Sequence, residues 1–242
     1  MSSGTIPLPN ETHGPADSST TTAQQTEQVA QQTQRRRRTG AAWAKKAAVL
    51  LVLAGLLFVF FQMTPGRPGP TCAPDCTMVD LSDADLSQAA MRSVIFLQAD
   101  LRGSDLRESD LYFADLTQAN LRNADLRNAD LSQARLEMAD LRGANLTHAS
   151  LRGADLRGAD LRDALLNNAD LRGATLVGAR LDRALLHDAI LTEADLSSAV
   201  LRRADLTNAT LRRADLRKAD LRLIIVAGAD FTGADLHGAI TH

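Results

Sequence analysis

The sequence predicts an all-β solenoid in the C-terminal two thirds of the chain, preceded by one transmembrane α-helix and a disordered N-terminus. Two observations predict the solenoid. An apolar residue recurs at every fifth position from Leu81 to Leu236, which gives 32 positions, of which 28 are Leu. Ala stands two residues earlier in 27 cases, and Asp or Asn stands between the two in 20 cases. The repeating unit is therefore Ala-Asp/Asn-Leu-X-X.

A period of five fits neither a regular helix nor a flat strand. On an α-helix five residues advance by about 500°, so successive leucines would share no face. On a strand five is odd, so successive leucines would alternate between the two faces. We therefore expect each unit to turn as a whole, with Ala and Leu directed inward, Asp outward, and a corner at the last two residues. The second corner residue is Gly in nine units and Asn in four, which is typical of turns.

The predicted interior is a stack of Leu and Ala, and we expect Leu141, Leu146, Leu151 and Leu156 in its core. A full unit reads Ala154-Asp155-Leu156-Arg157-Gly158. On this motif the chain resembles the pentapeptide repeat family over about residues 79–240. The resemblance implies a right-handed quadrilateral β-helix with four units per coil, and hence about eight coils. We assign residues 79–242 to this pentapeptide repeat domain.

One column of residues supports four units per coil. At a spacing of 20, the position after the central apolar residue is Arg in six of eight cases. These are Arg102, Arg122, Arg142, Arg162, Arg202 and Arg222. Aspartates recur on the same face. We interpret them as structural, because an Asp beside a turn hydrogen-bonds to backbone N–H groups and the neighbouring arginines neutralise it.

Residues 1–63 contain the two segments predicted to precede the solenoid. Residues 1–40 are rich in Gln, Ser and Thr and cannot bury enough apolar surface to fold, so we predict a disordered cytoplasmic tail. Residues 41–63 include 15 consecutive uncharged apolar residues, from Ala47 to Phe61. We predict a transmembrane helix that acts as an uncleaved signal anchor. A buried core helix and a cleaved signal peptide are the alternatives.

Residues 64–78 contain four Pro and form a predicted linker. Cys72 and Cys76 within it form a disulfide or remain a pair of thiols, and the sequence leaves this open. A spacing of this kind also occurs in metal and redox sites, but two ligands without a nearby His make a poor zinc site.

The charges that flank the apolar segment predict its orientation. Six cations precede it, Arg35–Arg38, Lys45 and Lys46, and only Arg67 lies in the twenty residues that follow. The positive-inside rule then places the N-terminus in the cytoplasm of a bacterium and the repeats outside the plasma membrane.

The composition excludes several classes of function. A net charge of -2 argues against a general nucleic-acid binder, so no nucleic acid is expected as a partner. The chain contains no nucleophile motif, phosphate-binding loop or paired histidines. We expect no catalytic residue, no cofactor and no bound metal.

Outward side chains that break the repeat are the candidate interaction surface. They are Leu165, Leu185, Leu223 and Ile225, the aromatic pair Tyr112 and Phe113, and Arg102, Arg122, Arg142 and Arg162 of the arginine column. The open end of a β-helix, together with C-terminal dimerisation within the family, also suggests a homodimer through residues 221–242. We therefore expect a membrane-tethered, extracytoplasmic scaffold or protein-interaction module with an unknown protein or envelope partner. Family analogy offers one alternative, a DNA mimic that interacts with gyrase, if the repeats are cytoplasmic.

Overall fold

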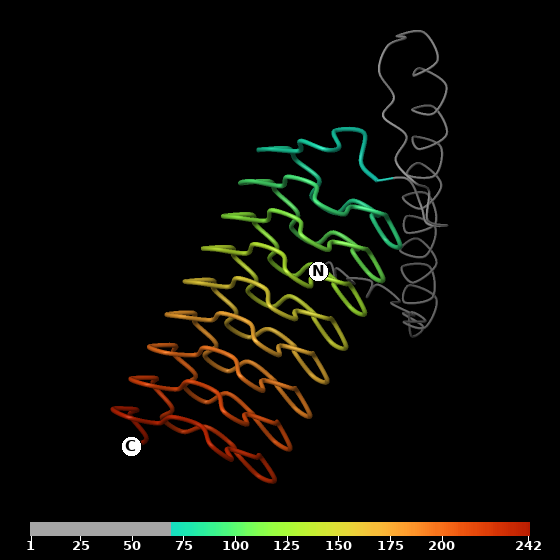
Figure 1. The fold of residues 1–242 in the computed structure, drawn as a ribbon. Helices are drawn as coiled ribbons and strands as arrows, with labels where there is room; N and C mark the ends of the chain where they lie inside the picture. The colour runs from blue at the N-terminus through green and yellow to red at the C-terminus, as the bar shows by residue number, and fades with distance from the viewer. Residues whose placement is uncertain (1–68) are drawn as a thin grey trace, which may run out of the picture. The chain divides into compact units, whose positions relative to one another are not determined.

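The computed structural model describes residues 69–242, which wind into a stack of coils running in one direction to His242 (Figure 1). This part of the chain contains no helix and no strand longer than a single bridge residue. It therefore contains no helix long and apolar enough to cross a membrane. The predicted tail 1–40, the predicted helix 41–63 and linker residues 64–68 lie outside the described residues.

Parallel bridges between successive coils define the fold. They run from the pair Asp75 and Ile95 to the pair Asp220 and Ile240, and every pair is 20 residues apart. Each coil therefore contains four five-residue units, one per side, which confirms the predicted β-helix. Because parallel strands lie about 4.8 Å apart, one coil lengthens the rod by about that amount.

The backbone of one unit, 154–158, shows how its N–H groups are satisfied. The N–H groups of Leu156 and Gly158 donate to carbonyl oxygens of the next coil at 2.7 and 3.0 Å, and that of Asp155 donates to the previous coil at 2.9 Å. The N–H of Ala154 closes the preceding corner at 3.0 Å. The fifth, that of Arg157, donates to Oδ1 of Asp155 at 3.1 Å. The outward Asp thus completes the backbone hydrogen bonding of its own unit.

Every corner has the same backbone conformation. The second corner residue has a positive φ, between 54° and 74°, in each unit from Met78 to Gly238. A positive φ at this position is typical of a type II turn and suits Gly. Bulkier residues such as Phe113 adopt it too, at a cost of roughly 1–2 kcal/mol each. The stacked coils therefore impose the turn even where the corner residue does not favour it.

The solenoid begins one unit earlier than the sequence predicts, within the predicted linker 64–78. Cys76 is buried in the position of a central Leu, and its N–H donates to the carbonyl oxygen of Ile95 at 2.7 Å. Pro and Cys replace Ala and Leu in this unit, which hides the repeat. Cys72 and Cys76 form a disulfide with an S–S distance of 1.96 Å. A Cβ on Gly69 would lie 2.9 Å from the carbonyl oxygen of Ala90, so this segment packs closely against the first coil.

The two ends of the solenoid differ. Residues 69–73 lead into the first coil and bring Cys72 against the core. At the other end, Val226 and Leu236 are 42% and 43% exposed, whereas the equivalent Leu206 and Leu216 one coil earlier are fully buried. Within residues 69–242 no other coil covers the last one, and its core side chains are partly exposed.

Candidate functional site

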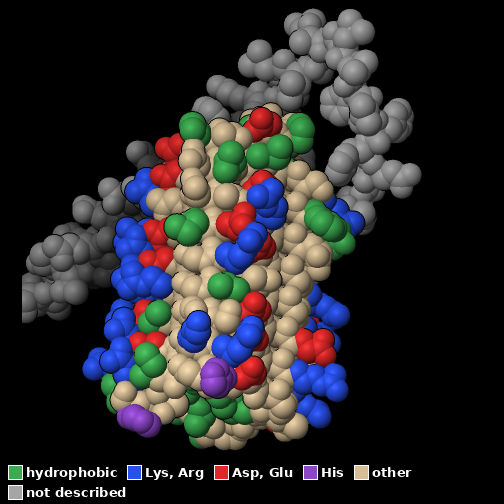
Figure 2. Space-filling view, turned by 60° about the vertical axis from the view of Figure 1, so that its left-hand side comes forward, with side chains coloured by type: hydrophobic (Ala, Val, Ile, Leu, Met, Phe, Trp, Pro, Cys, Tyr) green, Lys and Arg blue, Asp and Glu red, His purple; other side chains and the backbone are tan. Residues whose placement is uncertain are grey.

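Charged side chains line the solenoid in columns, with acidic beside basic groups (Figure 2). We call the side formed by the units centred on Leu81, Leu101 and every twentieth residue to Leu221 the arginine face. On it, Arg102, Arg142 and Arg162 each form an ion pair with the Asp of their own unit at 2.5 to 2.6 Å. Arg122 follows Asn120 and donates its backbone N–H to that side chain at 3.4 Å. The predicted arginine column is therefore largely a ladder of Asp–Arg pairs.

The same pairing occurs on the other faces and shifts the titration of the aspartates. The hydrogen bond from the Arg172 guanidinium lowers the pKa of Asp170 against the opposing effect of burial. The Arg127 guanidinium lowers the pKa of Asp125 in the same way. These carboxylates are thus paired with neighbouring arginines, and their oxygens are not free to bind a ligand.

Acidification is expected to destabilise the solenoid through these pairs. A folded-state pKa below the unfolded value of about 3.9 means that the unfolded chain takes up protons first, so stability is retained above about pH 5 and lost progressively below it. The thermal midpoint, followed by circular dichroism from neutral to acid pH, should show this fall. Replacing Arg127 and Arg172 with Gln should flatten the acid slope, and a midpoint that ignores pH would contradict the argument.

The predicted aromatic pair forms a compact corner. The rings of Tyr112 and Phe113 meet edge to face with centroids 4.7 Å apart. The Arg92 guanidinium lies 4.7 Å over the Tyr112 ring and its Nε is 3.1 Å from Asp110. Phe113 is 54% exposed in spite of its positive φ. Because every corner shares this φ, it is the exposure of the ring that makes Phe113 a candidate for contact with a partner.

Three of the four predicted apolar residues, Leu165, Leu185 and Ile225, lie in one column of bridged residues on the same side of the solenoid. Leu165 and Leu185 are partly buried and are joined by a bridge between successive coils. Asp205, whose Oδ2 lies 3.1 Å from Nε2 of His187, follows them on the same side. Leu223 and Ile225 are exposed near the C-terminal end of the solenoid. Leu141, Leu146, Leu151 and Leu156 all lie fully buried in the core.

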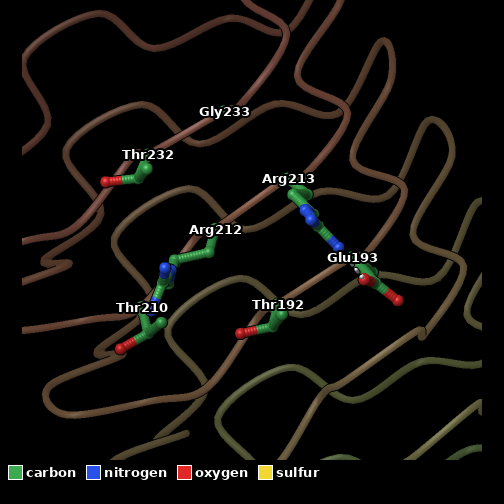
Figure 3. Close-up of a pocket in the computed structure, with 7 residues that line it drawn as sticks. All are labelled: Thr192, Glu193, Thr210, Arg212, Arg213, Thr232 and Gly233. Atoms are coloured by element: carbon green, nitrogen blue, oxygen red, sulfur yellow. Dashed lines mark hydrogen bonds and ion pairs between the residues drawn. The ribbon is translucent and has the colours of Figure 1, made fainter.

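A groove that the repeat pattern does not predict spans three coils near the C-terminal end (Figure 3). It is lined by Thr192, Glu193, Thr210, Arg212, Arg213, Thr232 and Gly233. The Arg213 side chain points toward Glu193, with 3.3 Å between the two groups (Figure 3). Within residues 69–242, no group of three or more His, Cys, Asp or Glu side chains could hold a metal ion.

The repeat pattern also does not reveal the role of Asp182. The sequence shows only that Asp182 interrupts the arginine column and that an Arg stands two residues before it. In the structure this carboxylate is buried and pairs with Arg202 of the following coil at 2.8 Å. The Asp in place of Arg at one position of the arginine column marks this site in the sequence. That Asp182 pairs with Arg202 becomes clear only when the coils are stacked.

A four-sided β-helix with a Leu–Ala core and five-residue units defines a repeat protein. The family description "Pentapeptide repeats (8 copies)" matches residues 75–108, 109–147, 149–188 and 189–226. The chain therefore belongs to the pentapeptide repeat family. A search of curated proteins gives no match.

Solved structures resemble the chain as well. QnrB1, a plasmid-mediated fluoroquinolone resistance protein, is 19% identical with a TM-score of 0.51, over 69% of this chain and 93% of QnrB1. HetL from Nostoc sp. strain PCC 7120, involved in heterocyst differentiation regulation, is 36% identical with a TM-score of 0.27, over 69% of this chain and 86% of HetL. The likeness to QnrB1 supports the fold.

Proposed function

We propose that this protein is a membrane-tethered, extracytoplasmic scaffold or protein-interaction module with no catalytic activity of its own. One observation carries the proposal: on a rod whose Asp–Arg pairs are satisfied locally, a few outward apolar side chains such as Phe113 are exposed to solvent. A rigid rod of this kind offers long faces to a partner rather than an enclosed substrate site. The membrane tether is residues 41–63, oriented by the six cations before them and the one after.

The expected partners follow from the same features. The membrane holds residues 41–63, and an unknown protein or envelope component binds the faces of the rod. We propose no cofactor and no nucleic acid, because the repeat region is mildly acidic and carries few aromatic groups.

A DNA mimic that interacts with gyrase is the second candidate. The eight units of residues 79–118 favour it because they contain eight acidic and three basic residues. This function requires a cytoplasmic repeat domain, so the two candidates differ in membrane topology. A reporter fused after His242 distinguishes them.

A homodimer through residues 221–242 belongs to the same proposal. The open core of the last coil, with Leu223 and Ile225 exposed beside it, offers an apolar surface that can contact itself about a two-fold axis. Hydrophobic side chains are visible at this lower end (Figure 2). Sedimentation of residues 69–242 should reveal a concentration-dependent dimer.

The matched variant Leu223→Glu with Ile225→Lys should be monomeric and folded, because both side chains point away from the core. A control with Met78→Glu, which alters an exposed residue at the opposite end, should leave the dimer intact. A parent protein that stays monomeric at high micromolar concentration would contradict the proposal.

A further inference from the structure

The arginine face loses its regular pairing in two successive coils. In the intact units Asp comes first and Arg second, as in Asp160 and Arg162, which pair at 2.6 Å. In the unit 179–183 the order is reversed, with Arg180 before Leu181 and Asp182 after it. In the next coil Val200 replaces the Asp, so that Arg202 has no carboxylate in its own unit.

Asp182 takes over the role of the missing carboxylate. Its Oδ1 lies 2.8 Å from Nε of Arg202, one coil further on. Asp182 is only 6% exposed, and its Oδ2 accepts no hydrogen bond from any group in residues 69–242. Nε of Arg180 lies 3.9 Å from that oxygen, beyond hydrogen-bond range. One buried carboxylate thus faces two arginines, and the second is held only loosely.

The result is a local reversal of charge. The units 179–183, 199–203 and 219–223 of the arginine face contain five arginines and two aspartates, a net charge of +3 (5 minus 2). Arg183 is paired with Asp163 of the preceding coil at 2.6 Å, and Arg222 with Asp220 of its own unit at 2.7 Å. We call the remaining three residues, Arg180, Arg202 and Arg203, the arginine patch. The first three units of the same face, 79–83, 99–103 and 119–123, contain two arginines and three aspartates, a net charge of -1 (2 minus 3).

The patch is accessible and has apolar groups beside its charges. The side chains of Arg180 and Arg202 are each 45% exposed, and Arg203 is exposed as well. Val200 is partly buried among them, and Leu223 is exposed at their C-terminal edge. Guanidinium groups bind carboxylates in a planar, two-pronged geometry, and an apolar centre rimmed by arginines is typical of protein interfaces.

We propose that the arginine patch binds an acidic segment of a partner protein, an inference that rests on the proposed role as an interaction module. The mixture of arginines with Val200 and Leu223 favours a peptide, which supplies carboxylates and apolar side chains together, over a purely ionic polymer. The intact units do not compete, because the Asp of each unit already engages its Arg and would repel a carboxylate.

The test compares two triple variants of the full-length chain in detergent. Arg180→Gln, Arg202→Gln and Arg203→Gln remove three charges from the patch. Arg107→Gln, Arg157→Gln and Arg217→Gln remove three charges that are each paired with the Asp of their own unit, and serve as the control. Binding of a fluorescein-labelled peptide, rich in glutamate with leucines at intervals, is measured by anisotropy at low and physiological ionic strength.

We expect the patch variant to raise the Kd by about tenfold or more and the control to change it less than about twofold. Equal losses in both variants would overturn the proposal, because net charge alone would then explain binding. Absence of binding by the parent chain would overturn it too. Arg180→Gln alone, checked by circular dichroism, ensures that a loss does not come from unfolding.

Two further probes test the kind of ligand. Inorganic polyphosphate and phosphatidylglycerol vesicles should bind more weakly than the peptide or independently of these arginines. If either binds as tightly through the same arginines, the peptide is not the specific occupant and the proposal fails. Membrane topology is measured separately, so a cytoplasmic repeat domain would refute the proposed location while leaving a positive peptide result for the patch intact.

Discussion

Replacing Leu151 with Ala is expected to lower the free energy of unfolding by about 2–5 kcal/mol. Leu151 is fully buried in the middle of the rod, between coils that stack on it from both sides. The loss combines the transfer energy of the removed atoms with the cavity they leave. Leu151→Asp should be more damaging, because it places a carboxylate among Leu and Ala with no cation to pair with. Denaturant unfolding followed by circular dichroism measures both.

The neighbouring residue provides the control. Arg152 points outward and is 3.8 Å from Asp170 in an exposed ion pair, so Arg152→Ala should change stability by less than about 0.5 kcal/mol. If Leu151→Ala and Arg152→Ala destabilised the protein equally, the assignment of inward and outward positions would be wrong.

The second large effect concerns the side of the membrane on which the repeats reside. Alkaline phosphatase fused after His242 should be active, because that enzyme acquires its disulfides only outside the cytoplasm. A reporter that works only in the cytoplasm should be silent at the same position. The reason is the excess of positive charge before residues 41–63.

A variant without these positive charges tests whether they set the orientation. With Arg35–Arg38, Lys45 and Lys46 replaced by Gln, phosphatase activity should fall and the cytoplasmic reporter should gain signal. Arg67→Gln, which removes the one cation after the segment, should leave the topology unchanged. A silent phosphatase in the parent chain would refute the extracytoplasmic location and favour the alternative function.

Most of the fold follows from the five-residue period. Because Leu and Ala alternate with an outward residue and five residues cannot repeat on one face of a regular element, a coil is the remaining way to bury them together. The unit that contains Cys76 was missed because Pro and Cys carry no trace of the Ala–Leu pattern. The positive φ of bulky corner residues such as Phe113 does not follow from their own preference, since the stacked coils override it.

The candidate sites were less accessible to sequence reasoning. Tyr112 and Phe113 are neighbours in the chain, so their shared corner was predictable. The pairing of Asp182 with Arg202 joins residues 20 apart, and whether Arg162 or Arg202 is chosen depends on side-chain geometry. The groove near Arg212 joins three coils and depends on how their side chains fill space.

Because every bridge joins residues 20 apart, a residue's number gives both the direction in which it faces around the solenoid axis and its position along that axis. Removing 20 residues from the middle of the rod would shift all later residues along the axis by one coil, about 4.8 Å, and leave the direction in which each of them faces unchanged. Removing five residues would preserve the Leu–Ala interior but rotate all later residues by a quarter turn about the axis. The orientation of Phe113 relative to Arg202 would then change. A partner that contacts both residues at once would therefore bind less well after the loss of a single unit, although the Leu–Ala core of the shortened protein would remain intact.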